Sequence, residues 1–179
     1  MPNTEQTATD LYTLPAPGMG RFRILGSVEA DFSESELNRL TTRLARALRF
    51  FPELNDVTVT VAKKPESHSW YAEADMNNDI IFLPTHELCP FQTICHELSH
   101  LAINKLDEQG VDVPPTSEEF TSILAIARLP PEHLDKSGIA YLGRPSVPRS
   151  EWPGICQRAL EYREEKRNYI QKCKEWLKV

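Results

Sequence analysis

The sequence predicts an α+β fold in which a small β-sheet packs against amphipathic helices. Two observations favour this fold. Runs with the two-residue alternation of β-strands occur in the middle of the chain, and segments whose apolar residues recur at helical spacing lie on both sides of them. The 179 residues, of which 40% are hydrophobic and 26% charged, are typical of a single globular domain with its own core.

The first part of the chain predicts a leader, a strand and a helix. Residues 1–20 contain Thr, Asn, Pro and Gly without an apolar period, which indicates a flexible leader, and RFRILGSVEA after them predicts a short strand. The pattern Ser33-x-x-Glu36 is typical of a capping box, so a helix should begin there and stop at Pro52. Its apolar residues recur at helical spacing: Leu37, Leu40, Leu44, Leu48 and Phe51.

The middle of the chain predicts strands followed by a long helix. VTVTVA, residues 57–62, alternates strictly and predicts a strand that is half buried on one face. WYAEADM and DIIFLP, joined by Asn77-Asn78, predict a β-hairpin or two neighbouring strands. The long helix should run from Pro90, which is tolerated in a first turn, to Gln109, because Gly110 can end it.

The last third predicts two further helices. One should begin at Thr116 or Ser117 and run to Pro130, and a connection rich in Pro and Gly should lead to a long C-terminal helix. We therefore expect three parts: a leader over residues 1–20, a domain over residues 21–149, and a helix over residues 150–179 that packs on the domain.

Charge and cysteine content restrict the classes of partner. The net charge of −6 and the pI near 5.4 argue against nucleic acid, because phosphate binding requires a basic surface. No apolar run approaches the roughly 20 residues of a membrane helix. The four cysteines have no C-x-x-C spacing, and MPNTEQTATD lacks the features of a secretory signal. We expect a soluble, cytoplasmic protein with reduced thiols and no membrane partner.

The stretch CHELSHL, residues 95–101, contains an H-E-x-x-H motif. Residues four apart lie on the same face of a helix, so His96 and His100 can both bind one ion. Glu97 lies about 100° around the helix from His96, close enough to accept a proton from a water molecule that the ion activates. Apolar residues gather opposite the histidines, which should therefore face a polar cleft. The motif predicts a Zn²⁺ site with Glu97 as general base.

Catalytic zinc normally has a third protein ligand, which must come from another segment. A metzincin would need Gly and His where this chain has Ile103 and Leu106, so that class is excluded. Glu118 and Glu119 lie at the start of the next predicted helix, and either would complete a thermolysin-type set of two His and one Glu. Because Thr116-x-x-Glu119 gives Glu119 a capping role, we favour Glu118 and keep Glu119 as the alternative.

The segments CHELSHLAINK and SEEFTSILAIARLPPEHL together resemble the ImmA/IrrE-type metallopeptidases. In that family the H-E-x-x-H helix is followed by a helix that starts near E-x-x-A-N/D-x-F-A. Here Glu118 takes the Glu position, Ser122 the Asn/Asp position, Leu124 the Phe position and Ala125 that of the following Ala, while Thr121 replaces the first Ala.

The resemblance covers about residues 70–134 and implies a zincin-like (gluzincin) fold, with the sheet packed on the active-site helix. It also implies a zinc metallopeptidase that cleaves a specific intracellular protein, often a repressor or another regulator, with the substrate extended along an edge strand. Tyr141 and His133 are candidates to steady the oxyanion, and His133 is a reserve third ligand. The other hypothesis is a non-catalytic regulatory or partner-binding protein built on the same scaffold.

Overall fold

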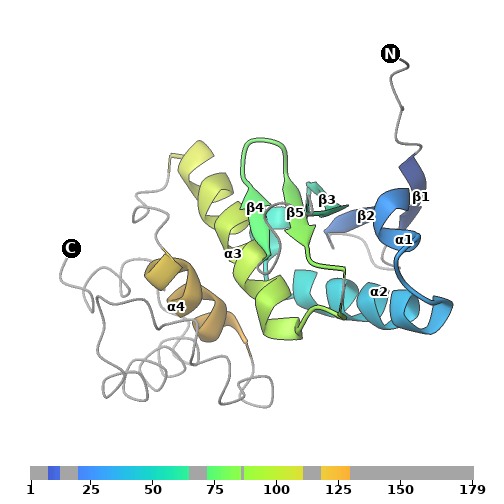
Figure 1. Cartoon of the computed structure of the whole chain (residues 1–179). Coiled ribbons are helices and arrows are strands. Elements are labelled where there is room, and N and C mark those ends of the chain that lie inside the picture. The colour runs from blue at the N-terminus through green and yellow to red at the C-terminus, as the bar shows by residue number, and fades with distance from the viewer. Residues whose placement is uncertain (1–7, 13–19, 65–71, 86, 111–117, 130–179) are drawn as a thin grey trace, which may run out of the picture. The chain divides into compact units, whose positions relative to one another are not determined.

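The computed structural model describes residues 8–12, 20–64, 72–85, 87–110 and 118–129 (Figure 1). By its internal contacts the chain divides into two compact units, residues 1–101 and 102–179. The described elements are helices and a small mixed sheet, so the α+β prediction is confirmed. The connection and the C-terminal helix predicted after Pro130, together with His133 and Tyr141, lie outside the described residues.

The first unit contains a sheet whose described strands have the order β1-β2-β3-β5-β4. The strands are β1 (Ala8–Tyr12), β2 (Arg21–Leu25), β3 (Thr58–Lys63), β4 (Glu73–Asp75) and β5 (Ile80–Leu83). β2, β3 and β5 are parallel, whereas β1 and β4 pair antiparallel at the two edges. The strands predicted within residues 21–83 are thereby confirmed.

Strand β1 lies within the predicted flexible leader, and that prediction is wrong for these residues. Tyr12 pairs with Phe22 and Leu11 with Arg23 across the antiparallel ladder to β2, with an irregularity between Ala8 and Leu11. Sequence pattern missed the strand because pairing with a neighbouring strand can outweigh weak local propensity.

Strand β3 is more buried than its alternating sequence predicts. Val59, Thr60, Val61 and Ala62 are all buried, because β3 lies in the interior of the sheet between two parallel neighbours. The hydroxyl of Thr60 accepts a hydrogen bond of 2.9 Å from Arg23 Nε, which satisfies this polar group inside the sheet. The prediction of a half-buried strand is therefore corrected.

The segment between β2 and β3 contains α1 (Gly26–Glu29), α2 (Glu34–Leu48) and the 3₁₀ helix Pro52–Leu54. The predicted capping box is present: Glu36 Oε2 accepts from Ser33 N at 2.9 Å, and Ser33 Oγ accepts from Glu36 N at 3.4 Å. Of the expected apolar stripe, the helix buries Leu40, Leu44 and Leu48, and Ala47 is buried as well. Leu37 is half-buried, and Phe51 is buried beyond the end of the helix, which stops at Leu48 rather than at Pro52. The short helix α1 was not predicted.

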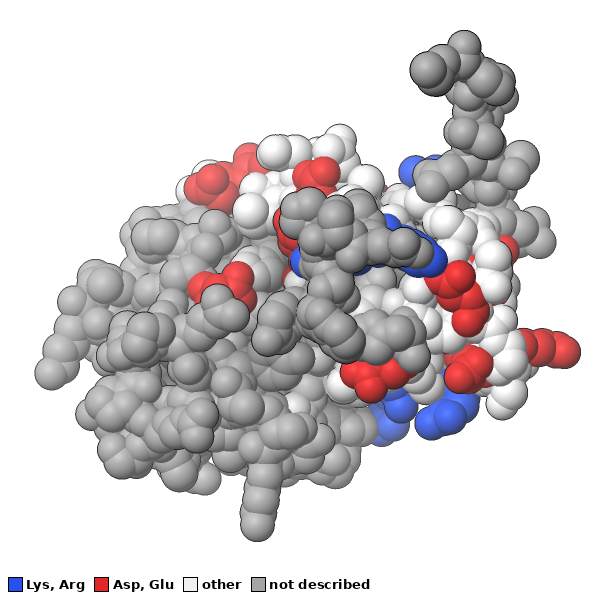
Figure 2. Space-filling view, in the orientation of Figure 1, with Lys and Arg blue, Asp and Glu red and all other residues white. Residues whose placement is uncertain are grey.

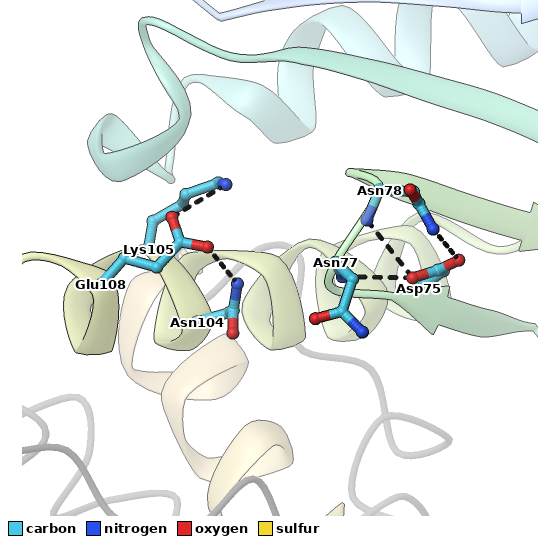
Figure 3. Close-up of polar contacts among 6 residues, drawn as sticks. All are labelled: Asp75, Asn77, Asn78, Asn104, Lys105 and Glu108. Carbon is cyan, nitrogen blue, oxygen red and sulfur yellow. Dashed lines mark hydrogen bonds and ion pairs between the residues drawn. The ribbon is translucent and has the colours of Figure 1, made fainter.

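The β4–β5 connection is a turn built around Asp75 (Figure 3). Asp75 Oδ1 accepts from the backbone N–H groups of Asn77 at 3.1 Å and Asn78 at 3.3 Å, and Asp75 Oδ2 accepts from Asn78 Nδ2 at 2.8 Å. Asp79 completes the turn with a φ of 54°, which non-glycine residues rarely adopt. The predicted hairpin is confirmed.

Helix α3 (Phe91–Glu108) starts directly after Pro90 and ends two residues before Gly110, which has a φ of 76°. Near its end, Glu108 accepts hydrogen bonds from Asn104 and Lys105 (Figure 3). This long helix was predicted within one residue at each end, which is within the normal uncertainty of helix boundaries.

The second unit contains the last turns of α3 and helix α4 (Glu118–Arg128). Leu124 of α4 packs against Ile103 and Leu106 of α3. The boundary between the two units falls inside α3.

On the face shown in Figure 2, the described Lys and Arg side chains lie beside Asp and Glu side chains. Among the described residues, no helix combines the length and the apolar character needed to cross a membrane.

Candidate metal centre

Contacts with α2 hold the start of α3 within the first unit. Arg43 Nη1 donates to the carbonyl oxygens of Leu88, at 3.4 Å, and of Cys89. The rings of Phe50 and Phe91 meet edge to face, with centroids 6.5 Å apart and an interplanar angle of 82°. Figure 1 shows the first turn of α3 beside the end of α2. The motif therefore lies on a helix whose starting point is fixed by one polar and one aromatic contact.

Every residue of α3 from Thr93 to Ile103 is buried. The apolar residues Ile94, Leu98 and Leu101 were expected to be buried, but Thr93 and Ser99 are buried as well. Ser99 Oγ donates to the Cys95 carbonyl at 2.8 Å, so this hydroxyl is satisfied within the helix. This part of α3 is therefore buried, and the predicted polar cleft beside the histidines stays a prediction.

The two histidines of the motif lie together on α3, as their spacing predicts. Their ring centroids are 5.0 Å apart at an interplanar angle of 84°, and His96 and His100 are 4% and 8% exposed. Burial of polar rings costs free energy unless they have partners, so such groups are retained where they serve a purpose. A pair of buried imidazoles on one helix face is what a metal site requires.

Glu118, at the start of α4, completes a group that could hold a metal ion. One ligand atom from each of His96, His100 and Glu118 can be chosen so that all three lie within 4.8 Å of one another. Ligands about 2.1 Å from a tetrahedral ion lie about 3.4 Å apart, so these atoms would have to move together by about 1 Å. The Glu118 side chain is exposed and can make this adjustment by a rotamer change.

Two nitrogen ligands and one carboxylate oxygen suit a zinc ion and several other divalent metals. Thr121 and Ser122 lie three and four residues after Glu118 on α4, on the same helix face, and are both buried, at 0% and 2% exposure. The Glu119 side chain lies outside the described part of the structure, so the alternative third ligand stays a prediction.

Glu97 is 5% exposed and lies between the two histidines in sequence. Its carboxylate is close enough to Cys89 to affect it: burial, and then the negative charge of Glu97, raise the pKa of the Cys89 thiol to about 12. Burial also raises the pKa of Cys95. Both thiols are free. Glu97 thus occupies a buried, polar environment next to the histidine pair, and its role as general base stays a prediction.

Sequence reasoning did not identify Arg43 as part of this arrangement. A single arginine at the polar edge of an amphipathic helix looks like any solvated residue. Only the position of the Leu88 and Cys89 carbonyl groups beside α2 reveals its contact, and no pattern in the sequence indicates that position.

No protein-family model matches the chain, and neither curated proteins nor solved structures gave a match.

Proposed function

We propose that the protein is a zinc-dependent endopeptidase that hydrolyses a peptide bond in a specific intracellular protein, such as a repressor or another regulator. One observation carries this proposal: ligand atoms of His96, His100 and Glu118 lie within 4.8 Å of one another. The H-E-x-x-H spacing and the partial resemblance to the ImmA/IrrE-type metallopeptidases support it, and the free, buried thiols of Cys89 and Cys95 suit a cytoplasmic protein.

In this proposal the three residues hold the ion and Glu97 handles the proton. Zinc would supply a Lewis acid that activates water and polarises the scissile carbonyl. Glu97 takes the proton from the attacking water and passes it to the leaving amine. Because Glu97 and His96 are adjacent on one buried helix, they keep a fixed geometry relative to each other.

The zincin-like fold is part of the same proposal. In zincins the substrate lies extended beside an edge strand, and β4 is an edge of the described sheet, adjacent to β5. An extended peptide could add to β4 through backbone hydrogen bonds, with alternate side chains setting specificity. β4 is short, Glu73–Asp75, so only a few residues of a bound substrate could pair with it and determine specificity.

The test is the change Glu97→Gln in protein loaded with zinc. This change keeps the size of the side chain and all three proposed ligands, but removes the general base. Cleavage of a proteome-derived peptide mixture, read by mass spectrometry, should fall about 100-fold to 10,000-fold while zinc content is unchanged. Glu108→Gln, at an exposed residue of the same helix, is the matched control and should cleave as the wild type does. Equal cleavage by the wild type and Glu97→Gln would refute the proposal.

The burial of Glu97 favours one other function, a non-catalytic regulator on the same scaffold. At 5% exposure the carboxylate can meet a substrate only if covering segments move. If the zinc-loaded wild type cleaves nothing and its cellular function survives Glu97→Gln, partner binding without hydrolysis becomes the better reading.

A further inference from the structure

Three buried polar residues follow one another at intervals of four near the start of α3: Cys89, Thr93 and Glu97. Their exposures are 1%, 5% and 5%. Residues four apart in a helix lie above one another on one face, so Thr93 and Glu97 form a line that Cys89 extends from the segment before the helix. The Thr93 side chain hydrogen-bonds the Cys89 thiol. We call these three residues the buried polar line.

Arg43 contacts the beginning of this line. Its Nη1 donates to the carbonyl oxygens of Leu88 and Cys89, the two residues immediately before Pro90. Three charged groups influence the Cys89 thiol, namely Glu97, Arg43 and Glu87. The guanidinium of Arg43 and the carboxylate of Glu97 therefore lie near the same buried thiol, and their charges are opposite.

Both ends of this contact are mechanically stiff. Arg43 belongs to α2, which is held in the core by Leu40, Leu44 and Leu48, each at most 1% exposed. On the other side, every residue of α3 from Thr93 to Ile103 is buried, so a displacement of its first turn must move the following turns with it. What fixes the carbonyl groups before Pro90 thus also fixes the position of Glu97.

We propose that Arg43 is a positioning residue for Glu97. By holding the carbonyl groups of Leu88 and Cys89, it fixes the position of the buried polar line relative to His96 and His100. The inference rests on the proposed function for the role of Glu97, but the contact itself can be tested without any substrate. Hydrogen bonds from a charged donor are the stronger kind, and a lysine cannot reproduce the planar, multi-donor guanidinium.

The experiment measures thiol alkylation in the folded full-length chain by peptide mapping. Buried thiols react only after local opening, so the labelling rate of Cys89 reports how firmly its segment is held. Cys95, buried inside α3, serves as an internal reference, because global unfolding would accelerate both residues. The variants are Arg43→Gln and Arg43→Lys, with Arg46→Gln as the matched control at an exposed arginine of α2.

The ratio of Cys89 to Cys95 labelling should rise about tenfold or more in Arg43→Gln, as expected when the charge-assisted hydrogen bonds to Leu88 and Cys89 are lost. It should rise less in Arg43→Lys and stay constant in Arg46→Gln. A double-mutant cycle with Glu97→Gln should be non-additive, because the two residues act on one segment. An unchanged ratio, equal acceleration of both thiols, or additive effects would overturn the proposal.

Catalysis gives the second readout. In Arg43→Gln the kcat for peptide cleavage should fall, while KM and the zinc dissociation constant stay at wild-type values, because ligands and substrate contacts are untouched. Parallel loss of zinc affinity would show that Arg43 acts through the histidines and would refute its role toward Glu97. If the wild type binds zinc but cleaves no peptide, the proposed peptidase function is refuted. The thiol-labelling experiment would still test whether Arg43 holds the buried polar line.

Discussion

If the proposed zinc site exists, replacement of Glu118 by Gln should remove most of the stability that bound zinc would add to the fold. The change preserves side-chain size but deletes the negative charge of one of the three groups that lie within 4.8 Å of one another. Loss of a residue that merely orients a ligand already weakens metal binding by about 10–100-fold, so loss of a ligand should raise the dissociation constant at least about 100-fold.

The size of the effect follows from mass action. At a free zinc concentration about 100 times the wild-type dissociation constant, binding stabilises the folded chain by about 2.7 kcal/mol. At the same concentration a variant that binds about 100-fold more weakly is half saturated and gains about 0.4 kcal/mol. The expected loss is therefore about 2.3 kcal/mol of zinc-dependent stability, which is well above the error of comparative unfolding experiments.

The assay is urea unfolding followed by circular dichroism, with free zinc held constant by a metal buffer. Glu108→Gln is the control, because Glu108 lies on α3 and is exposed, so it should retain the full zinc effect. If Glu118→Gln gains as much stability from zinc as the wild type, Glu118 is not a ligand. A loss confined to Glu119→Gln would instead assign the third position to Glu119.

Two predictions concern the scaffold. Gly20→Ala should destabilise the fold by about 1–3 kcal/mol, because an added Cβ would lie 2.9 Å from the Leu54 carbonyl oxygen. Gly110→Ala should destabilise it by only about 1 kcal/mol, because nothing lies within 4 Å of the added Cβ and only the φ of +76° is unfavourable. Equal losses of stability in urea unfolding would contradict this account. Asp31, held by Lys63 at 2.7 Å, has its pKa lowered below the ordinary 3.8, first by that hydrogen bond. The contribution of Asp31 to the free energy of unfolding is therefore present above pH 3.8 and is lost as the pH falls through its folded-state pKa. In Asp31→Asn the free energy of unfolding should consequently fall less steeply at acidic pH than in the wild type. The same decrease in both proteins would contradict the ion pair with Lys63.

Local signals in the sequence were sufficient for most of the described fold. The capping box at Ser33, the hairpin at Asn77-Asn78 and the Pro90 to Gly110 limits of α3 each depend on residues close in sequence, and all three appear as predicted. Strand β1 and the full burial of β3 depend on pairing with other strands, which the pattern within each strand does not encode.

The same division applies to the candidate site. The i, i+4 spacing of His96 and His100 places both on one face of a helix. Glu118 was favoured because Glu119 has a predicted capping role, and a ligand atom of Glu118 does lie close to both histidines. By contrast, the burial of the motif and the contact from Arg43 arise where α3 meets other parts of the chain. Periodicity describes which residues share a helix face but cannot say what covers that face.

The two thiols at the start of α3 also bear on which metals this protein would accept in a cell. Sulfur binds metals strongly only as thiolate, and burial raises the pKa of Cys89, to about 12, and of Cys95, which makes the thiolate form of both residues rarer still. Although Cys95 directly precedes His96, its thiol is therefore a poor soft donor for an ion held by the histidines. If His96, His100 and Glu118 hold an ion as proposed, its selectivity would rest on nitrogen and oxygen atoms rather than on sulfur.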